Sequence, residues 1–230
     1  MSKVDFLHFP EQEFCTTTLS YGPPGCGKTY MVLMALKYWI DKKMFDKYVC
    51  VIPAFKNEME KSYDWLNDHL DVVDIYEAYD DSIATEIVKM QEKNNKLFDA
   101  KKIKKKPRIF FMCDDATGQK GLFESPSLLR MVIENRHLNV HSWFLLHRDK
   151  GVIKPALREN MKFVFLYPVH VERLKALFTE YINFMNDFEN FNEFKEFWRE
   201  YILKQEHGCL FVMDRTAYNP FCSKWFDNSK

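Results

Sequence analysis

The sequence predicts an α/β fold in which a mainly parallel central sheet is flanked by helices. Short apolar segments alternate with longer segments of helical periodicity, which is the pattern of parallel strands joined by crossover helices. The apolar segment 108–113 (RIFFMC) has no polar alternation, as expected for a strand buried on both faces. Three of the seven glycines, Gly22, Gly25 and Gly27, lie together between the first strand and the first long helix.

Strands are expected where apolar, β-branched and aromatic residues form short runs. The first, Phe14–Tyr21, is rich in Thr and aromatic residues. The other expected strands are Lys47–Pro53, Asp71–Tyr76, Arg108–Cys113, Val140–Leu146, Lys162–Leu166 and Cys209–Asp214.

Helices are expected where apolar residues recur every three or four positions. The expected helices are Lys28–Asp41, Asn57–Leu70, Ser82–Phe98, Ser127–Arg136 (with Ser127 or Ser125 near its start) and Val171–Lys204, the last broken near Asn190–Asn192. With no internal repeat and no long linker, residues 1–230 are expected to form a single domain. Residues 14–167 would supply the core sheet, and residues 168–230 a helical stretch and a closing strand.

Composition excludes few functions. Lys plus Arg and Asp plus Glu are equal at 33 each, and this balance neither supports nor excludes a nucleic-acid partner, since binding needs only a local basic surface. The six cysteines form no CxxC pair and have no zinc-ligand spacing, so reduced thiols are expected. Neither a signal peptide nor a membrane span is expected, which favours an intracellular protein.

Residues 22–29 (GPPGCGKT) match the phosphate-loop pattern G-x-x-x-x-G-K-[ST]. Glycines let backbone N–H groups turn toward phosphate oxygens, and the following helix directs its positive N-terminus at the anion. Lys28 is expected to reach the β- and γ-phosphates, and the Thr29 hydroxyl to hold Mg²⁺. The expected nucleotide-binding residues are Gly22, Pro23, Pro24, Gly25, Cys26, Gly27, Lys28, Thr29 and Tyr30. A chance match is the alternative, and the strand before the loop and the helix after it weigh against this.

Asp114 and Asp115 end the apolar segment 108–113 and are the expected acidic half of the site. Asp114 would orient Mg²⁺ directly or through water, and Asp115 would polarise the attacking water as general base. The alternative is a solvated turn after a strand. The sequence between Lys28 and Asp114 leaves room for an additional strand, which indicates a P-loop NTPase of the additional-strand, RecA-like type.

Three segments together resemble a known family. They are GPPGCGKT at 22–29, FFMCDD at 110–115 and ENRHLNVHSWFLLH at 134–147, with IKPALREN at 153–160 following. The combination resembles the viral genome-packaging ATPases of the FtsK–HerA superfamily, which include the poxvirus-type and virophage enzymes. The resemblance covers roughly residues 14–167 and, more loosely, the closing segment CLFVMDRT.

The resemblance implies ATP and Mg²⁺ as cofactors, and catalytic roles for Lys28, Asp115, Arg136 and His147. Thr29 and Asp114 would be the metal ligands. Arg136 lies where a packaging motor places an arginine that completes a neighbouring subunit's site; Arg158 is the other candidate. His147 occupies the position of the polar sensor, which is usually Gln or Asn, and Asp115 stands where Glu is more common.

Each of these assignments has a structural alternative. Arg136 could be a helix-end arginine stabilised by the helix dipole, Arg158 a surface residue, and His147 a strand-end histidine with a backbone partner. The basic segment 101–106 (KKIKKK) could follow a DNA backbone or be a solvated loop. The aromatic residues of 178–201 follow helical spacing and are expected to pack in the core, with a subunit or capsid interface as the alternative.

By resemblance, the expected function is ATP-driven translocation of viral double-stranded DNA into a preformed capsid by a ring-like homo-oligomer. Viral capsid or inner-membrane proteins are further candidate partners, and the host cytoplasm, at the viral factory, and the virion are the expected locations. A filamentous-phage-type assembly or export ATPase is the nearest alternative, although such proteins typically carry a membrane span. A small-molecule kinase and a nucleotide-binding structural protein without turnover are the remaining alternatives.

Overall fold

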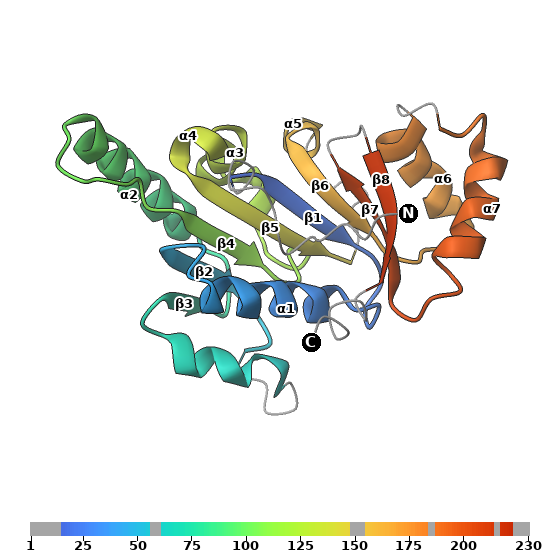
Figure 1. Ribbon diagram of the computed structural model, residues 1–230, viewed down its shortest axis with the longest axis horizontal. Helices are drawn as coiled ribbons and strands as arrows, with labels where there is room; N and C mark the ends of the chain where they lie inside the picture. The colour runs from blue at the N-terminus through green and yellow to red at the C-terminus, as the bar shows by residue number, and fades with distance from the viewer. Residues whose placement is uncertain (1–14, 56–60, 148–154, 184–186, 214–216, 223–230) are drawn as a thin grey trace.

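The computed structural model describes residues 15–55, 61–147, 155–183, 187–213 and 217–222. These residues form one sheet in the order β3-β2-β4-β5-β1-β6-β7-β8 (Figure 1). The strands are β1 (Thr17–Tyr21), β2 (Lys47–Val51), β3 (Val73–Tyr76), β4 (Ile109–Cys113), β5 (Val140–Leu146), β6 (Met161–Leu166), β7 (Gly208–Met213) and β8 (Ala217–Cys222). Strands β1 to β6 pair in parallel, whereas β7 and β8 are antiparallel additions.

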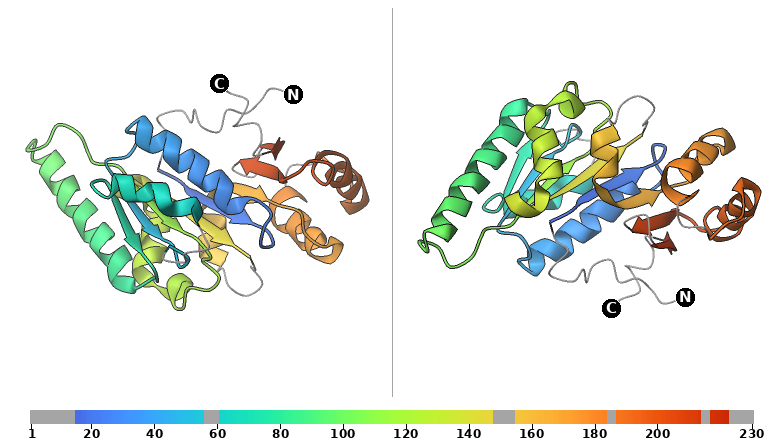
Figure 2. Two further views of the ribbon diagram at one scale, coloured as in Figure 1. Left: turned by 90° about the horizontal axis from the view of Figure 1, so that it is seen from below. Right: turned by 90° about the horizontal axis from the view of Figure 1, so that it is seen from above.

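Helices cover both faces of the sheet, so the central strands are buried on both sides, as their unbroken apolar sequences predict. On one face α1 (Lys28–Asp41) and the 3-10 segment η2 (Lys61–His69) pack against β2, β4, β5 and β6. The other face carries α2 (Asp81–Asp99), α3 (Pro126–Ile133), α4 (Asn135–Leu138), α6 (Val171–Leu177) and α7 (Phe191–Tyr201), as Figure 2 shows. The predicted α/β class is therefore confirmed.

Strand β5 lies between β1 and β4 and pairs with both. The acidic strand is thus separated from the phosphate-loop strand by one strand, as predicted for the additional-strand type. Because all three strands are parallel, their carboxyl ends meet at one edge of the sheet. That edge carries the residues that follow Tyr21, Cys113 and Leu146.

The structure differs from the sequence prediction in several elements. The expected helix Ser127–Arg136 is two helices, because Glu134 leaves the helical region (φ −95°, ψ 18°) between α3 and α4. The short helix α5 (Pro155–Glu159) and the edge strand β8 were not expected, and the expected helix Asn57–Leu70 is a 3-10 segment over its described part.

The long C-terminal helical stretch is broken where predicted, because the Asn190 side chain accepts from two backbone N–H groups and begins α7. Before the break, α6 continues into the π-helical turn η4 (Phe178–Ile182). The described aromatic residues of this stretch pack in or against the core, as expected, except Tyr201, which is exposed at the end of α7; Phe178, Tyr181, Phe194 and Trp198 are buried, and Phe184 lies outside the described residues. Among the described residues, no helix has the length and apolar character required to cross a bilayer.

Candidate nucleotide-hydrolysis site

The phosphate loop connects β1 to α1, as the sequence predicts. Gly22 lies against Tyr167, and a Cβ at this position would come within 2.5 Å of the Tyr167 Cβ, so only glycine fits. Gly25 (φ 73°) and Gly27 (φ 101°) have left-handed backbone conformations, and Gly27 is the N-cap of α1. The loop therefore turns its backbone toward the start of a 14-residue helix, where an anion is favoured.

Lys28 is almost entirely buried, at 3% exposure. Its ammonium group donates to the carbonyl oxygens of Gly22 and Pro23, both at 2.7 Å, and lies 3.1 Å from the His147 Nδ1 atom. Burial lowers the pKa of Lys28, and the nearby Asp114 and Asp115 carboxylates oppose this shift. The only positive charge inside the loop thus lies between the loop carbonyls and the acidic pair.

Asp114 follows β4 and has a carboxylate held by three donors. Its Oδ2 atom accepts from the Thr29 hydroxyl at 3.2 Å and from the Tyr63 hydroxyl, and its Oδ1 atom accepts from the Asp115 N–H at 2.8 Å. Thr29 and Asp114 therefore bring a hydroxyl and a carboxylate oxygen together, and both are ligands that Mg²⁺ prefers. Within the described segments no three His, Cys, Asp or Glu side chains gather as a metal site.

Asp115 has a left-handed backbone conformation (φ 44°), which is uncommon for a residue with a side chain. A Cβ at Gly118 would lie 3.0 Å from the Asp115 Oδ2 atom, so the glycine leaves room for this carboxylate. The Asp115 Oδ1 atom lies 3.6 Å from the His147 Nε2 atom. The Asp115 carboxylate thus lies on the side of His147.

His147 follows β5 and lies between Lys28 and Asp115. Burial and the nearby Lys28 charge lower its pKa, which Asp115 and Asp114 partly offset. A neutral ring must accept the Lys28 proton at Nδ1, because an ammonium group can only donate. The remaining proton is then on Nε2, the ring nitrogen that lies on the side of Asp115.

A cavity of about 910 Å³ opens over these residues and has room for a nucleotide. Gly25, Gly27, Thr29 and the exposed Tyr30 line it from the loop and α1. Pro23 and Pro24 are exposed at the outer turn of the loop, and Cys26 is partly buried beneath Lys28. The remaining lining includes three aromatic rings that sequence reasoning did not select, those of Tyr63, Trp65 and His207.

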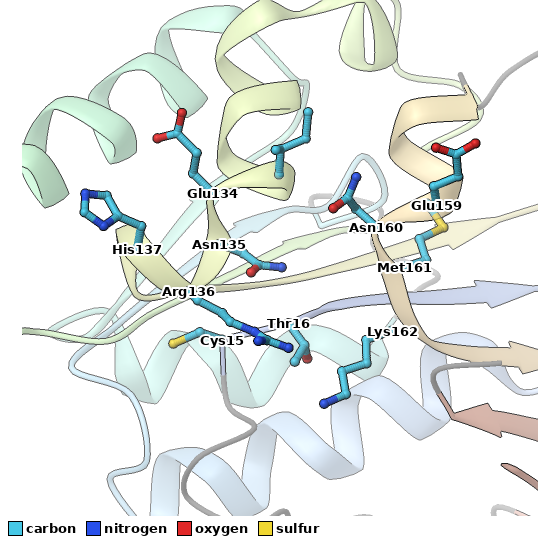
Figure 3. A pocket seen from close by; sticks show the side chains of 11 residues that line it. Cys15, Thr16, Glu134, Asn135, Arg136, His137, Glu159, Asn160, Met161 and Lys162 are labelled. Atoms are coloured by element: carbon cyan, nitrogen blue, oxygen red, sulfur yellow. The ribbon is translucent and has the colours of Figure 1, made fainter. Parts of the chain in front are cut away.

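Arg136 lies at the opposite edge of the sheet, in α4, and does not reach the nucleotide site of its own chain. It lines a second pocket, of about 510 Å³, together with Thr16, Glu159 and Lys162 (Figure 3). Arg136 is exposed, and among the described residues its guanidinium group has no hydrogen bond or ion pair. Arg158, the other candidate, pairs with the partly buried Glu180, whose Oε1 atom lies 3.3 Å from the guanidinium group.

Three contributors to the site were missed from sequence. Tyr63 comes from η2 and binds Asp114, Thr117 receives the His147 N–H at 3.2 Å, and His207 packs against Gly27. Each of them is far from the motifs in sequence or outside the phosphate-loop pattern. No spacing rule could have selected Tyr63 and His207, since only the packing of distant segments brings them to this edge, whereas Thr117 lies two residues after Asp115.

Solved structures with the same fold include viral and secretion ATPases. The genome packaging NTPase B204 from Sulfolobus turreted icosahedral virus 2, solved with ATP-gammaS, is 13% identical, with a TM-score of 0.59 over 90% of this chain and 97% of that chain. The EssC protein (ATPases 2 and 3) from Geobacillus thermodenitrificans is 15% identical, with a TM-score of 0.60 over 92% of this chain and 40% of that chain. These likenesses confirm the predicted P-loop ATPase fold.

Comparison with protein families identifies the family as well as the fold. A search of curated proteins found no match. The family model described as poxvirus A32 protein matches residues 12–181, which is most of the chain and contains every motif residue assigned above. The predicted resemblance to the poxvirus-type packaging ATPases is therefore confirmed, and the chain belongs to the poxvirus A32 family.

Proposed function

We propose that this chain is an ATP-hydrolysing translocase that moves viral double-stranded DNA into a preformed capsid. The observation that carries this proposal is the convergence of Lys28, Thr29, Asp114, Asp115 and His147 at one edge of the sheet, beside a cavity of nucleotide size. Family membership supports the packaging role, and the geometry of the site supports ATP hydrolysis. The proposed locations are the host cytoplasm, at the viral factory, and the virion.

The residues of the site divide the reaction between binding and proton transfer. The loop N–H groups and Lys28 would bind the phosphates of ATP, and Thr29 with Asp114 would hold Mg²⁺, which offsets phosphate charge when bound. Asp115 would accept a proton from the attacking water. His147 would fix the direction of the Asp115 carboxylate, since its Nε2–H faces that group.

A ring-like homo-oligomer is part of the proposal. Arg136 is proposed to act on the nucleotide bound by the next subunit, because it lies at the edge opposite its own site and its guanidinium group extends into an open pocket (Figure 3). The ion pair between Arg158 and Glu180 favours Arg136 over Arg158 for this role. An exposed, uncommitted arginine is what a trans-acting cation requires.

The decisive experiment measures ATP turnover with and without long double-stranded DNA. The wild-type rate is expected to rise severalfold on DNA addition, and Lys28→Ala is expected to lower it by at least about a hundredfold, since it removes the phosphate-binding cation. Lys175→Ala, an exposed lysine on α6, is the matched control and is expected to behave as wild type. A rate that ignores DNA but rises with a small phosphate acceptor would instead identify a kinase.

A further inference from the structure

Helix α1 ends in an unusual way. The N–H of Lys43 donates to the carbonyl of Ile40 at 3.0 Å, and the N–H of Met44 donates to the carbonyl of Trp39 at 2.9 Å. This pair of bonds is the Schellman termination, in which the penultimate residue takes a left-handed conformation and is usually glycine. Here that residue is Lys43, with φ 52°.

Helix α2 ends in the same way with the same residue type. The N–H of Lys101 donates to Phe98 and the N–H of Lys102 donates to Leu97, both at 2.8 Å. Lys101 has φ 56° and occupies the glycine position. A left-handed lysine is disfavoured relative to glycine, because its Cβ crowds the following carbonyl. Two helices therefore retain lysine where glycine would be more stable, which points to a role for the side chain.

The two helix ends lie at the same edge of the sheet, opposite the phosphate loop (Figure 1). Asp46 joins them: its carboxylate accepts from the Arg108 N–H at 2.7 Å and pairs with Lys105 at 3.4 Å. The same Asp46 donates its N–H to the Arg108 carbonyl at 2.8 Å. The segment after α1 and the segment after α2 are thus bound to each other.

The charge at this edge is strongly positive although the chain as a whole is neutral. Residues 93–108 contain eight basic side chains and one acidic side chain, Asp99. Near α1 the acidic groups are Asp41, at the helix end, and Asp46, which is already engaged by Lys105 and Arg108. We define the basic face as Lys42, Lys43, Lys101, Lys102, Lys104 and Lys105, all of which are exposed.

We propose that the basic face binds the phosphate backbone of double-stranded DNA, so that it is the surface on which the translocase holds its substrate. This inference rests on the proposed function and names the part of the chain that serves it. Lysine side chains contact DNA phosphates and carry no sequence information. Binding of this kind is independent of base sequence, which suits a motor that moves a whole genome. The ring of Phe98 does not form a stacking platform, because the Lys106 ammonium lies over it at 5.2 Å.

DNA fits this face better than a second protein surface does. The centres of protein interfaces are depleted in lysine, whose long side chain is costly to order and desolvate. Phosphate contacts exploit lysine instead, because they release counterions and leave the side chains hydrated. The face also lies over the amino ends of β2 and β4, beside rather than within the pocket that contains Arg136.

The test uses the left-handed lysines, because replacing them separates binding from folding. The double variant Lys43→Gly with Lys101→Gly is expected to raise Tm by roughly 4 °C. It is also expected to weaken binding of a fluorescent 40-base-pair duplex about tenfold, and to lower the slope of log Kd against log salt by about 1.8 for two lost contacts. Basal ATPase without DNA is expected to remain at the wild-type rate.

Two further pairs complete the experiment. Lys102→Glu with Lys104→Glu reverses two charges of the basic face and is expected to weaken duplex binding more strongly than the glycine pair. Lys175→Ala with Lys204→Ala removes two exposed charges from α6 and from the segment after α7 and is expected to leave Kd and slope unchanged.

The assignment would be overturned if both double variants of the basic face kept the wild-type Kd and salt slope. It would also be overturned if the control pair lost as much duplex affinity as they do. Unchanged duplex binding with weakened self-association would identify the face as a subunit contact instead. If the wild type binds no duplex even at low salt, the proposed function itself falls, and the DNA face with it. Failure of the face alone leaves DNA-stimulated hydrolysis intact.

Discussion

At the scale of single residues, the Asp114 carboxylate is held by three hydrogen-bond donors. Its two oxygens accept from a hydroxyl on α1, a hydroxyl on η2 and the following backbone N–H. These three hydrogen bonds fix the orientation of the carboxylate before a metal binds, so less conformational entropy is lost on metal binding. Tyr63 is the contributor whose role can be isolated, because its ring is buried and only its hydroxyl reaches Asp114.

Tyr63→Phe keeps the ring and removes that hydroxyl. We expect the fold to remain, the Mg²⁺ concentration for half-maximal turnover to rise, and kcat to fall by about tenfold, which corresponds to the loss of one hydrogen bond to a charged group. The dissociation rate of a bound, non-hydrolysable ATP analogue, measured as a function of Mg²⁺ concentration, provides a readout that does not depend on turnover. Tyr201→Phe, at an exposed tyrosine at the end of α7, is the control. An unchanged Mg²⁺ dependence would show that Tyr63 only fills space.

His147 predicts a defined pH dependence. Its pKa is lowered below the usual 6.5 by burial and by Lys28, so the ring is neutral at pH 7 and gains a proton only in more acidic solution. Protonation removes the acceptor for Lys28, and kcat is therefore expected to fall as pH falls through the lowered pKa. The unfolded chain binds this proton more readily than the folded one, so the His147 contribution to stability is also lost as pH falls.

The matching variant is His147→Asn, which places an amide at the sensor position. Asparagine does not titrate, so the fall of kcat at low pH that is due to His147 (the acidic limb of the pH–rate profile) is expected to disappear. At pH 8, kcat is expected to stay within about tenfold of wild type. Rates measured from pH 5 to pH 9 at saturating ATP compare the two proteins. An identical acidic limb in both would assign that limb to another group.

At the scale of elements, short-range sequence patterns predicted most of the fold. The bounds of α1 and β5 match the expected ranges, because each is an apolar-rich segment with no glycine or proline inside it. The elements that were missed depend on distant partners. Strand β8 has the mixed sequence AYNPFC and exists by pairing with β7, while α5 is a single turn between β5 and β6.

The same distinction holds for the site. Lys28, Thr29, Asp114 and Asp115 could be selected from local motifs whose residue types the chemistry requires. Tyr63 and His207 could not, since their positions in the site arise from how η2 and the segment before β7 pack on the sheet. The π-helical turn after α6 has no account in the local sequence.

Helix α3 provides a test at this scale. Ser125 is nearly buried, accepts from the Leu128 N–H at 2.9 Å and donates its hydroxyl to Asp81 at the start of α2. One side chain thus begins one helix and contacts the beginning of another. Ser125→Ala is expected to lower the free energy of unfolding by about 1–2 kcal/mol in urea titrations. Nucleotide affinity is expected to stay at the wild-type value, and a loss below about 0.3 kcal/mol would show that the cap contributes little.

At the scale of the whole molecule, the chemistry is divided between the two edges of the sheet. The carboxyl edge holds the nucleotide residues, and the amino edge holds the Arg136 pocket and the basic face. A contact that brings the Arg136 pocket of one subunit to the nucleotide edge of the next joins two different surfaces. Such head-to-tail contacts close into rings when the rotation between subunits allows it. A ring built in this way requires two chains for every complete site.

Subunit mixing tests that arrangement. Arg136→Ala lacks the trans cation but keeps its own phosphate loop and acidic pair, whereas Asp115→Asn lacks the base but keeps Arg136. Each variant alone is expected to turn over ATP at least about a hundredfold more slowly than wild type. In a mixture, an Asp115→Asn subunit can supply its arginine to the intact acidic pair of an Arg136→Ala neighbour, so hydrolysis is expected to recover and to peak near equal amounts. Arg158→Ala is the matched control and is expected to keep most of its activity alone, because its guanidinium is bound to Glu180. If no ratio restores hydrolysis while both variants still associate and bind ATP, Arg136 does not act in trans.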